Sequence, residues 1–332
     1  MRDFLNLKIS FAVILTFVIS LSFLYFINDW YFTQTNLEEE KFYAKQIDNV
    51  EKQIFLVGSS HTIRLDPNLI QKFLQKHGFD YDVYNIAKTG DKPSNRVNSI
   101  ERIISAKPEI IVYGLDIVSF RSDPNERIIT PQNSFIKNID IQNNLNHLFF
   151  EIINDSKSID LMNFKNPKLT SLKIIMDITK NDDSVNYSPN QPFSKNDIFT
   201  LIMNTPQLEN NVKEKPFSEK GRFVDHDGID FFTMKKILKN FKESNIQIIL
   251  FITPHHEIYL NDMSDKDKNT FFAIIEDLKN EFNIKVYDLH DKYSDKNIWW
   301  DATHIARNAP GGLIYSEDIA KIVLEEIKNI AV

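Results

Sequence analysis

The sequence contains no cysteine and only 8 glycines among its 332 residues. The absence of cysteine excludes disulfides, cysteine nucleophiles and cysteine-ligated zinc, and it leaves the redox compartment open. The formal net charge is -7, and the chain has no block rich in lysine and arginine. Binding of nucleic acid is therefore not expected, because that function needs a concentrated positive surface. The chain is nevertheless long enough to bury the core of an enzyme domain.

Charged residues are also missing from "ISFAVILTFVISLSFLYFI", a stretch that covers residues 9–27. At about 1.5 Å per helical residue, this stretch is long enough to cross a hydrocarbon core of about 30 Å. Arg2 and Lys8 precede it and three glutamates at 38–40 follow it, and basic residues favour the cytoplasmic side. We predict that residues 1–28 form a cytoplasmic stub and an uncleaved single-pass anchor, with the rest of the chain extracytoplasmic. A cleaved signal peptide is the alternative, but its apolar core is typically shorter.

After the anchor, residues 29–52 are polar, charged and compatible with a helix, so we interpret them as a juxtamembrane spacer before a folded domain at 53–332. Helical patterns in this domain alternate with short apolar runs, which predicts strands of a parallel sheet that is buried on both faces. The predicted fold class is α/β: three layers, with a doubly wound, five-stranded parallel sheet. The predicted strands cover residues 53–57, 82–86, 109–113, 246–252 and 284–289.

A long insertion, at about residues 120–230, separates the third and fourth predicted strands and is rich in asparagine, aspartate, serine and lysine. Because it follows a strand end, we expect it to lie over the carboxyl edge of the sheet, where ligand sites form in this architecture. We interpret it as a cap or substrate-binding subdomain. A disordered loop is the alternative, and it fits the polar middle better than the amphipathic patches "LNHLFFEIIND" and "LTSLKIIMDITK".

Three of the few glycines, Gly58, Gly90 and Gly114, lie at or just beyond the ends of the first three predicted strands. Glycine at such a place lets the backbone turn sharply and lets N–H groups approach a ligand. Gly58 is followed directly by Ser59 and Ser60. The first strand end is therefore a candidate site for a hydroxyl nucleophile.

A carboxylate and an imidazole lie close together near the C-terminus, where "DATH" places Asp301 three residues before His304. On one loop these two side chains can lie side by side. If the loop folds to the sheet edge that carries Ser60, the three side chains form the Ser-His-Asp arrangement that activates a hydroxyl for acyl transfer.

Four sequence blocks lie in order at predicted strand ends: "GSS" (58–60), "NIAKTG" (85–90), "GLD" (114–116) and "DATH" (301–304). Together they resemble the motifs of the SGNH/GDSL hydrolase superfamily, and they extend across nearly the whole chain beyond the anchor. The order of the blocks carries the resemblance, because each block alone is common by chance. The resemblance implies a flavodoxin-like α/β fold with serine esterase or acyltransferase activity.

The resemblance also assigns roles to individual residues. It makes Ser60 the nucleophile, His304 the general base and Asp301 the carboxylate that orients the imidazole. It implies an oxyanion hole made by the backbone N–H groups of Ser60 and Gly90 and by an asparagine side chain after the third strand. Asp116 stands in place of that asparagine, and an ionised carboxylate cannot donate a hydrogen bond. Asp116 is therefore protonated, or it positions another group, or the third donor is missing.

Other residues are candidates to line the site, each with a structural alternative. His61 and Gly114 are candidate binding residues, although His61 equally fits packing at the start of the next helix. His255 and His256 follow the fourth predicted strand and are candidates to line the pocket, but no metal site is expected from the two together, because adjacent histidines rarely chelate one ion. The remaining candidates are Arg64 and Arg121 for an anionic group or for salt bridges, "DHDG" (225–228) as a turn, and Trp299 with Trp300 for sugar stacking or burial.

The resemblance and the predicted topology together imply a serine-dependent acyl ester hydrolase or O-acyltransferase that acts on an extracytoplasmic acylated substrate such as a cell-envelope polysaccharide. No cofactor is expected. The main alternative is a non-catalytic binding or scaffold protein with the same fold, because Asp116 and Ser59 depart from the family pattern. A lysophospholipase or thioesterase shares the chemistry and differs only in substrate.

Overall fold

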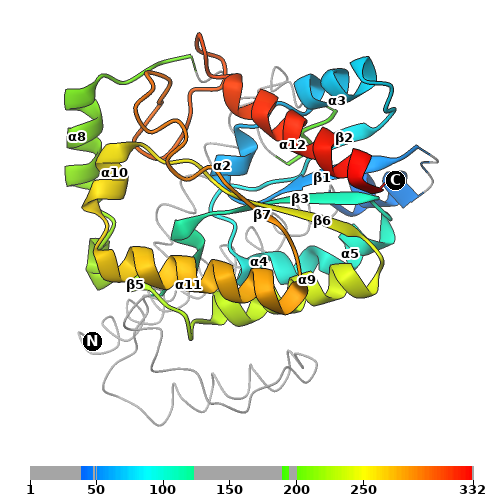
Figure 1. The fold of residues 1–332 in the computed structure, drawn as a ribbon, viewed down its shortest axis with the longest axis horizontal. Helices are drawn as coiled ribbons and strands as arrows, with labels where there is room; N and C mark the ends of the chain where they lie inside the picture. Colours follow the sequence, from blue (N-terminus) through cyan, green and yellow to red (C-terminus); the bar gives the residue numbers. More distant parts are fainter. Residues whose placement is uncertain (1–38, 48, 50, 123–188, 194–199, 331–332) are drawn as a thin grey trace, which may run out of the picture. The chain divides into compact units, whose positions relative to one another are not determined.

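The computed structural model describes residues 39–47, 49, 51–122, 189–193 and 200–330. Apart from Glu39, they belong to one compact unit formed by Glu40–Ile128 and Val185–Val332. A five-stranded parallel sheet forms the centre of this unit (Figure 1). Its strands are β1 (Gln53–Val57), β2 (Asp82–Asn85), β3 (Ile110–Leu115), β6 (Gln247–Ile252) and β7 (Val286–Asp288). All five predicted strands are present, so the predicted fold class is confirmed.

The strands are arranged in the order β2-β1-β3-β6-β7. β1 lies between its two neighbours, and Leu56 pairs with Asn85 on one side and with Val112 on the other. Every residue of β1 and of β3 is buried, as expected of central strands that are covered on both faces. This is the flavodoxin-like order, in which the chain reverses direction across the sheet between β1 and β3. A crevice is expected at the carboxyl ends of these two strands.

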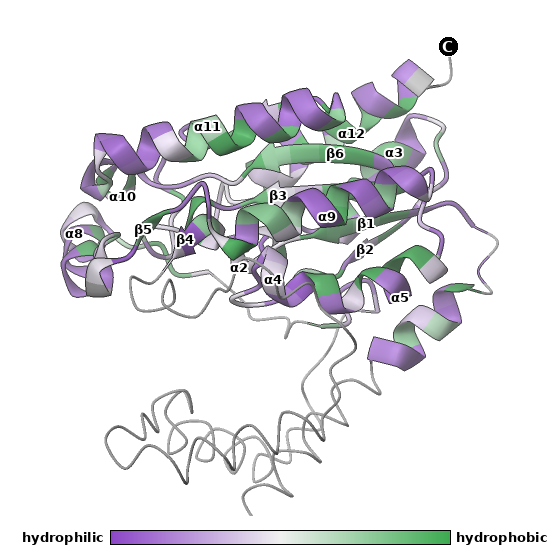
Figure 2. Ribbon diagram, turned by 90° about the horizontal axis from the view of Figure 1, so that it is seen from below, coloured by the Kyte–Doolittle hydropathy of each residue, from purple (hydrophilic) through white to green (hydrophobic). Residues whose placement is uncertain are grey.

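Helices cover both faces of the sheet. In Figure 1, α3 and α12 lie above the sheet, and α4, α5, α9 and α11 lie below it. Figure 2 shows apolar residues along the sheet and on the helix sides that face it, while the outer sides are hydrophilic. The helices are α2 (Ser60–Ile63), α3 (Pro67–Lys76), α4 (Pro93–Arg96), α5 (Ile100–Ser105), α8 (Thr205–Glu214), α9 (Ile229–Glu243), α10 (Glu257–Asp262), α11 (Asp265–Phe282) and α12 (Ile314–Ile330).

The beginning of the folded domain differs from the sequence expectation. Residues 39–47 are helical, and Tyr43 on this helix is only 2% exposed. The Phe42 ring contacts the rings of Phe55 in β1 and Tyr84 in β2, at centroid distances of 6.1 and 5.5 Å. The expectation that residues up to 52 form a spacer outside the domain is therefore wrong for this helix. Its aromatic side chains are part of the core.

Two predicted features lie wholly or mostly outside the described residues. The predicted anchor at 9–27 is one of them, and in the described part of the chain no helix is long and apolar enough to cross a membrane. The other is the insertion at about 120–230, of which the first and last parts are described. There, β4 (Arg121–Ser122) pairs antiparallel with β5 (Phe223–Val224), so the two ends of the insertion are joined.

Candidate active site

Gly58 allows the nucleophile segment to turn sharply at the end of β1. Its φ angle is 145°, a conformation that residues with a side chain rarely adopt. A Cβ atom on Gly58 would also lie 2.3 Å from Oγ1 of Thr62 in α2 and 3.0 Å from the carbonyl oxygen of Gly114. A Cβ atom on Gly114 would lie 2.2 Å from the same Oγ1. The two glycines thus let α2 begin directly against the ends of β1 and β3.

The structure brings Ser60, His304 and Asp301 together. Nε2 of His304 lies 2.7 Å from Oγ of Ser60, and Nδ1 lies 2.9 Å from each carboxylate oxygen of Asp301. Because a carboxylate only accepts hydrogen bonds, Nδ1 carries the proton and Nε2 accepts the bond from the Ser60 hydroxyl. This is the geometry that makes a serine hydroxyl nucleophilic.

The loop that carries Asp301 and His304 is held by its own hydrogen bonds. The backbone N–H groups of Thr303 and His304 donate to Oδ1 of Asp301, at 2.8 and 2.7 Å. The Thr303 hydroxyl donates to the same oxygen at 2.9 Å. The loop is closed by a bridge between Trp299 and Ile305. The spacing of "DATH" therefore places the imidazole directly over its carboxylate.

Asp301 is ionised in this arrangement. Burial by itself raises the pKa of a carboxyl group, but the hydrogen bond and charge of His304, together with the bonds from Thr303, lower the pKa of Asp301 well below its ordinary value. A negative charge thus stands behind the imidazole, where it can stabilise an imidazolium ion.

The two residues whose backbone N–H groups are the predicted oxyanion donors, Ser60 and Gly90, both line the pocket. Ser60 is the first residue of α2, and the first N–H groups of a helix have no partner within it. Gly90 lines the same pocket as Ser60 and has a φ angle of 67°. A Cβ atom on Gly90 would meet no other atom within 4 Å, so glycine is required there by the backbone conformation and not by lack of space.

Asp116 is not placed as an oxyanion donor. Its Oδ2 atom lies 2.8 Å from Nδ1 of His61 and accepts a hydrogen bond of 3.0 Å from the Ser59 hydroxyl. Its Oδ1 atom accepts a hydrogen bond from the backbone N–H of Val118 and lies 3.4 Å from Nε2 of His255. Burial raises the pKa of a carboxyl group, but His61 and His255 lower the pKa of Asp116 well below its ordinary value. Of the three alternatives, the geometry favours an ionised Asp116 that positions other groups.

The predicted binding residues His61 and Gly114 occupy different environments. His61 lines the pocket, and its ring stacks on the His304 ring at a centroid distance of 4.4 Å and an interplanar angle of 20°. Gly114 is not among the residues that line this pocket, and its lack of a side chain makes room for Thr62 and Phe251. Gly114 therefore serves the packing of Thr62 and Phe251 and does not line the pocket, contrary to the expectation that it binds ligand.

A pocket of about 300 Å³ opens over Ser60 and His304. Most of the described residues that line it have polar or charged side chains, and some of them come from the end of the predicted insertion. A larger hollow, of about 460 Å³, lies at the amino ends of β6 and β7, but its described lining contains no serine and no histidine. The first pocket is therefore the candidate active site. Sequence reasoning missed several of its lining residues: Asp91, Lys92, Val118, Ser119, Asn211, Lys215, Pro216, Glu219, Tyr259 and Thr303.

Weak sequence signals mark some of these missed residues. Lys92 follows Gly90 by two positions, and Thr303 lies inside the "DATH" block. Asn211 and Lys215 lie at the end of α8, whose start carries a capping box formed by Asn204 and Gln207. The capping box indicates a helix but not its position over the sheet edge.

The remaining candidates are divided between the pocket and the core. Arg121 lines the pocket, donates a 2.6 Å hydrogen bond to the carbonyl oxygen of Phe217 and covers the Phe217 ring. Arg64 is buried against the Trp300 ring and does not line the pocket. Trp299 is only 1% exposed, which favours burial over sugar stacking.

The two adjacent histidines after β6 point in different directions. Nδ1 of His256 accepts a hydrogen bond from the backbone N–H of Ile258 and thereby caps α10. His255 faces Asp116 instead. In "DHDG", the Asp225 side chain accepts a hydrogen bond from the N–H of Asp227, which is the predicted turn.

Comparison of the sequence with protein-family models and with curated proteins gave no match. Among solved structures, the chain is similar to an acetyl xylan esterase at 12% identity and a TM-score of 0.42, over 82% of this chain and 99% of that one. It is similar to the lipase/acylhydrolase from Enterococcus faecalis at 11% identity and a TM-score of 0.42, over 84% and 96% of the two chains. A GDSL-like lipase from Bacteroides thetaiotaomicron matches at 10% identity and a TM-score of 0.38, over 89% and 98%.

These structural neighbours are esterases and lipases. The function proposed below is based on the geometry of the site and not on these likenesses.

Proposed function

We propose that this protein is a serine-dependent acyl ester hydrolase or O-acyltransferase. The observation that carries the proposal is the continuous line of hydrogen bonds from Ser60 through His304 to Asp301, at 2.7 and 2.9 Å. This arrangement stands at the carboxyl ends of parallel strands, beside the point where the chain reverses across the sheet. It lies in a pocket that is open to a ligand.

The geometry supports a two-step acyl transfer. Oγ of Ser60 attacks the ester carbonyl carbon while Nε2 of His304 takes its proton, and the carbonyl oxygen becomes an oxyanion. The backbone N–H groups of Ser60 and Gly90 stabilise that oxyanion. His304 then returns the proton to the leaving alcohol, and an acyl group remains on Ser60. The acyl group is then released to an acceptor: attack by water completes hydrolysis, and attack by a second hydroxyl group completes acyl transfer.

We favour a glycan ester as the substrate. Most of the described residues that line the pocket have polar or charged side chains, including Lys92 and Arg121, and such side chains can bind the hydroxyl groups of a glycan. The uncharged stretch at 9–27 supports an anchored, extracytoplasmic domain, and hence a substrate in the cell envelope.

The test of the chemistry is hydrolysis of a chromogenic acetyl ester by the purified full-length protein, combined with labelling by a fluorophosphonate. Wild type should hydrolyse the ester and gain the mass of one phosphonyl group, and Ser60→Ala should do neither. Ser105→Ala is the matched control: it should keep the label, because Ser105 lies exposed at the end of α5 and does not line the pocket. A folded wild type that reacts with neither reagent would favour the non-catalytic binding protein. Separately, protease should reach the domain only from the extracytoplasmic side of intact cells.

A further inference from the structure

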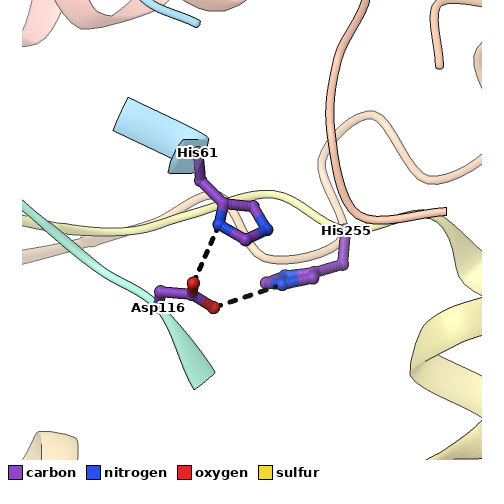
Figure 3. Close-up of side chains that lie close together, drawn as sticks. All are labelled: His61, Asp116 and His255. Atoms are coloured by element: carbon purple, nitrogen blue, oxygen red, sulfur yellow. Dashed lines mark ion pairs between the residues drawn. The ribbon is translucent and has the colours of Figure 1, made fainter. Parts of the chain in front are cut away.

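Three side chains beside the candidate active site form a compact cluster of metal-binding groups. They are His61 at the start of α2, Asp116 after β3 and His255 after β6, and Figure 3 shows both imidazole rings facing the carboxylate. All three residues are buried, and one ligand atom from each lies within 4.8 Å of the others. His255 is adjacent to His256 in the sequence, but the fold places it beside Asp116 and His61, which follow two other strands.

The hydrogen bonds of His255 leave one ring nitrogen aimed at the carboxylate. Nδ1 lies 3.1 Å from the carbonyl oxygen of Thr253, and because a carbonyl only accepts, Nδ1 carries a proton. Nε2 has no hydrogen-bond partner among the described residues and lies 3.4 Å from Oδ1 of Asp116. In a neutral ring, Nε2 would direct a lone pair at a negative oxygen. A metal ion between the two atoms, or a proton on Nε2, would remove this repulsion.

The same arrangement is typical of histidines that bind metal ions. Such a histidine usually donates its second N–H to a backbone carbonyl or carboxylate, which fixes the tautomer and directs the free nitrogen to the metal. His61 and Asp116 complete the donor set, and the Ser59 hydroxyl lies 3.0 Å from both Nδ1 of His61 and Oδ2 of Asp116. Two imidazoles and a carboxylate are donors that zinc prefers.

We propose that His61, Asp116 and His255 bind a zinc ion, with the Ser59 hydroxyl or water at the remaining position. The ion enters through the pocket, because His61, Asp116 and Ser59 all line it. It joins the ends of β1, β3 and β6 at the carboxyl edge of the sheet and neutralises the buried carboxylate. Zinc binding does not depend on esterase activity, so the proposal stands apart from the proposed function.

The test begins with the full-length wild-type protein, which is stripped with a chelator and then incubated with zinc. Metal analysis after desalting should find about one zinc per chain, with a dissociation constant of about 1 μM or lower. X-ray absorption of the loaded protein should show only nitrogen and oxygen ligands, at about 2.0–2.1 Å, with imidazole scattering. Zinc should also raise the melting temperature, because the folded state alone holds the three ligands together.

Two variants connect the binding to these residues. His255→Gln and Asp116→Asn should each weaken zinc binding by at least about 100-fold, since loss of an outer contact alone costs about 10- to 100-fold. His290→Gln is the matched control, because His290 pairs with Asp288 on the surface and should leave binding unchanged. Ser60→Ala should lose esterase activity and keep the zinc, which separates the two proposals.

If the wild-type protein retains no zinc after loading, the proposal is wrong. A proton on Nε2 of His255 would then supply the positive charge that faces Asp116. Zinc that remains bound with equal affinity in folded His255→Gln protein, as judged by circular dichroism, would also overturn the proposal. Absence of esterase activity in a wild type that holds one zinc would leave the metal site intact.

Discussion

Nε2 of His304 lies 2.7 Å from Oγ of Ser60, although the two residues are 244 positions apart in the sequence. The contact joins the first strand end of the sheet to the loop before the last helix. It requires the whole βα framework between them to be in place. Local interactions alone do not produce it, whereas the contact between His304 and Asp301 is local.

Asp301→Asn should lower kcat on the order of 10⁴-fold. The asparagine oxygen can still accept the N–H groups of Thr303 and His304, so the loop keeps its shape while the charge behind the imidazole is lost. Steady-state kinetics on the chromogenic ester measure the effect. Asp301→Ala is the control, because it also removes the acceptor and should lower the melting temperature further. Equal kcat values for wild type and Asp301→Asn would refute the assigned role.

As the pH is lowered below about 4, the free energy of unfolding should decrease more steeply in wild type than in Asp301→Asn. The pKa of Asp301 is lower in the folded state than its unfolded value of about 3.9, so its contribution is complete above that value and is lost as the pH falls through the folded pKa. The slope of the unfolding free energy should differ by up to about 1.4 kcal/mol per pH unit between pH 4 and lower values. Urea denaturation at several pH values tests this, and parallel curves would contradict it.

Asp116→Asn should lower both stability and turnover, although it restores the amide of the family pattern. The carboxylate contacts the buried imidazoles of His61 and His255, and loss of one partner of a buried pair costs about 3–5 kcal/mol. Chemical denaturation and kinetics measure the two effects. The control is Asp277→Asn, which breaks an exposed contact with His226 and should cost less than about 1 kcal/mol. A faster enzyme would instead show that Asp116 is a weakened oxyanion donor.

Gly58→Ala should destabilise the domain by at least about 2 kcal/mol and abolish activity. The new Cβ would meet Oγ1 of Thr62 at 2.3 Å, which displaces α2 and with it Ser60. Gly78→Ala is the matched control, because Gly78 also has a positive φ but a Cβ atom added there would meet no other atom within 4 Å. The control should lose about 1 kcal/mol and keep its activity. Similar losses in both variants would show that the space around Gly58 does not matter.

Sequence patterns alone were sufficient to predict the strands of the sheet and the site residues that directly follow strand ends. β1 matches the predicted run at 53–57, because an uninterrupted apolar sequence has few alternatives to a buried strand. Ser60 and Gly90 were predictable because glycine is rare in this chain and falls just after strands. The pair of Asp301 and His304 was predictable because three residues of separation allow a local contact.

Tertiary structure alone decided which of the remaining side chains meet. Tyr43 lies in a polar segment, and only its contact with the core shows that the domain begins before Gln53. Asp116 caps a short 3-10 helix at Ile117–Phe120, and its pairing with His61 and His255 depends on the order of β1, β3 and β6 in the sheet. A strand order is set by long-range packing and hydrogen bonding, so no local pattern along the chain records it. The sequence by itself therefore determined the elements and the position of the proposed nucleophile, and the fold determined which charged groups surround it.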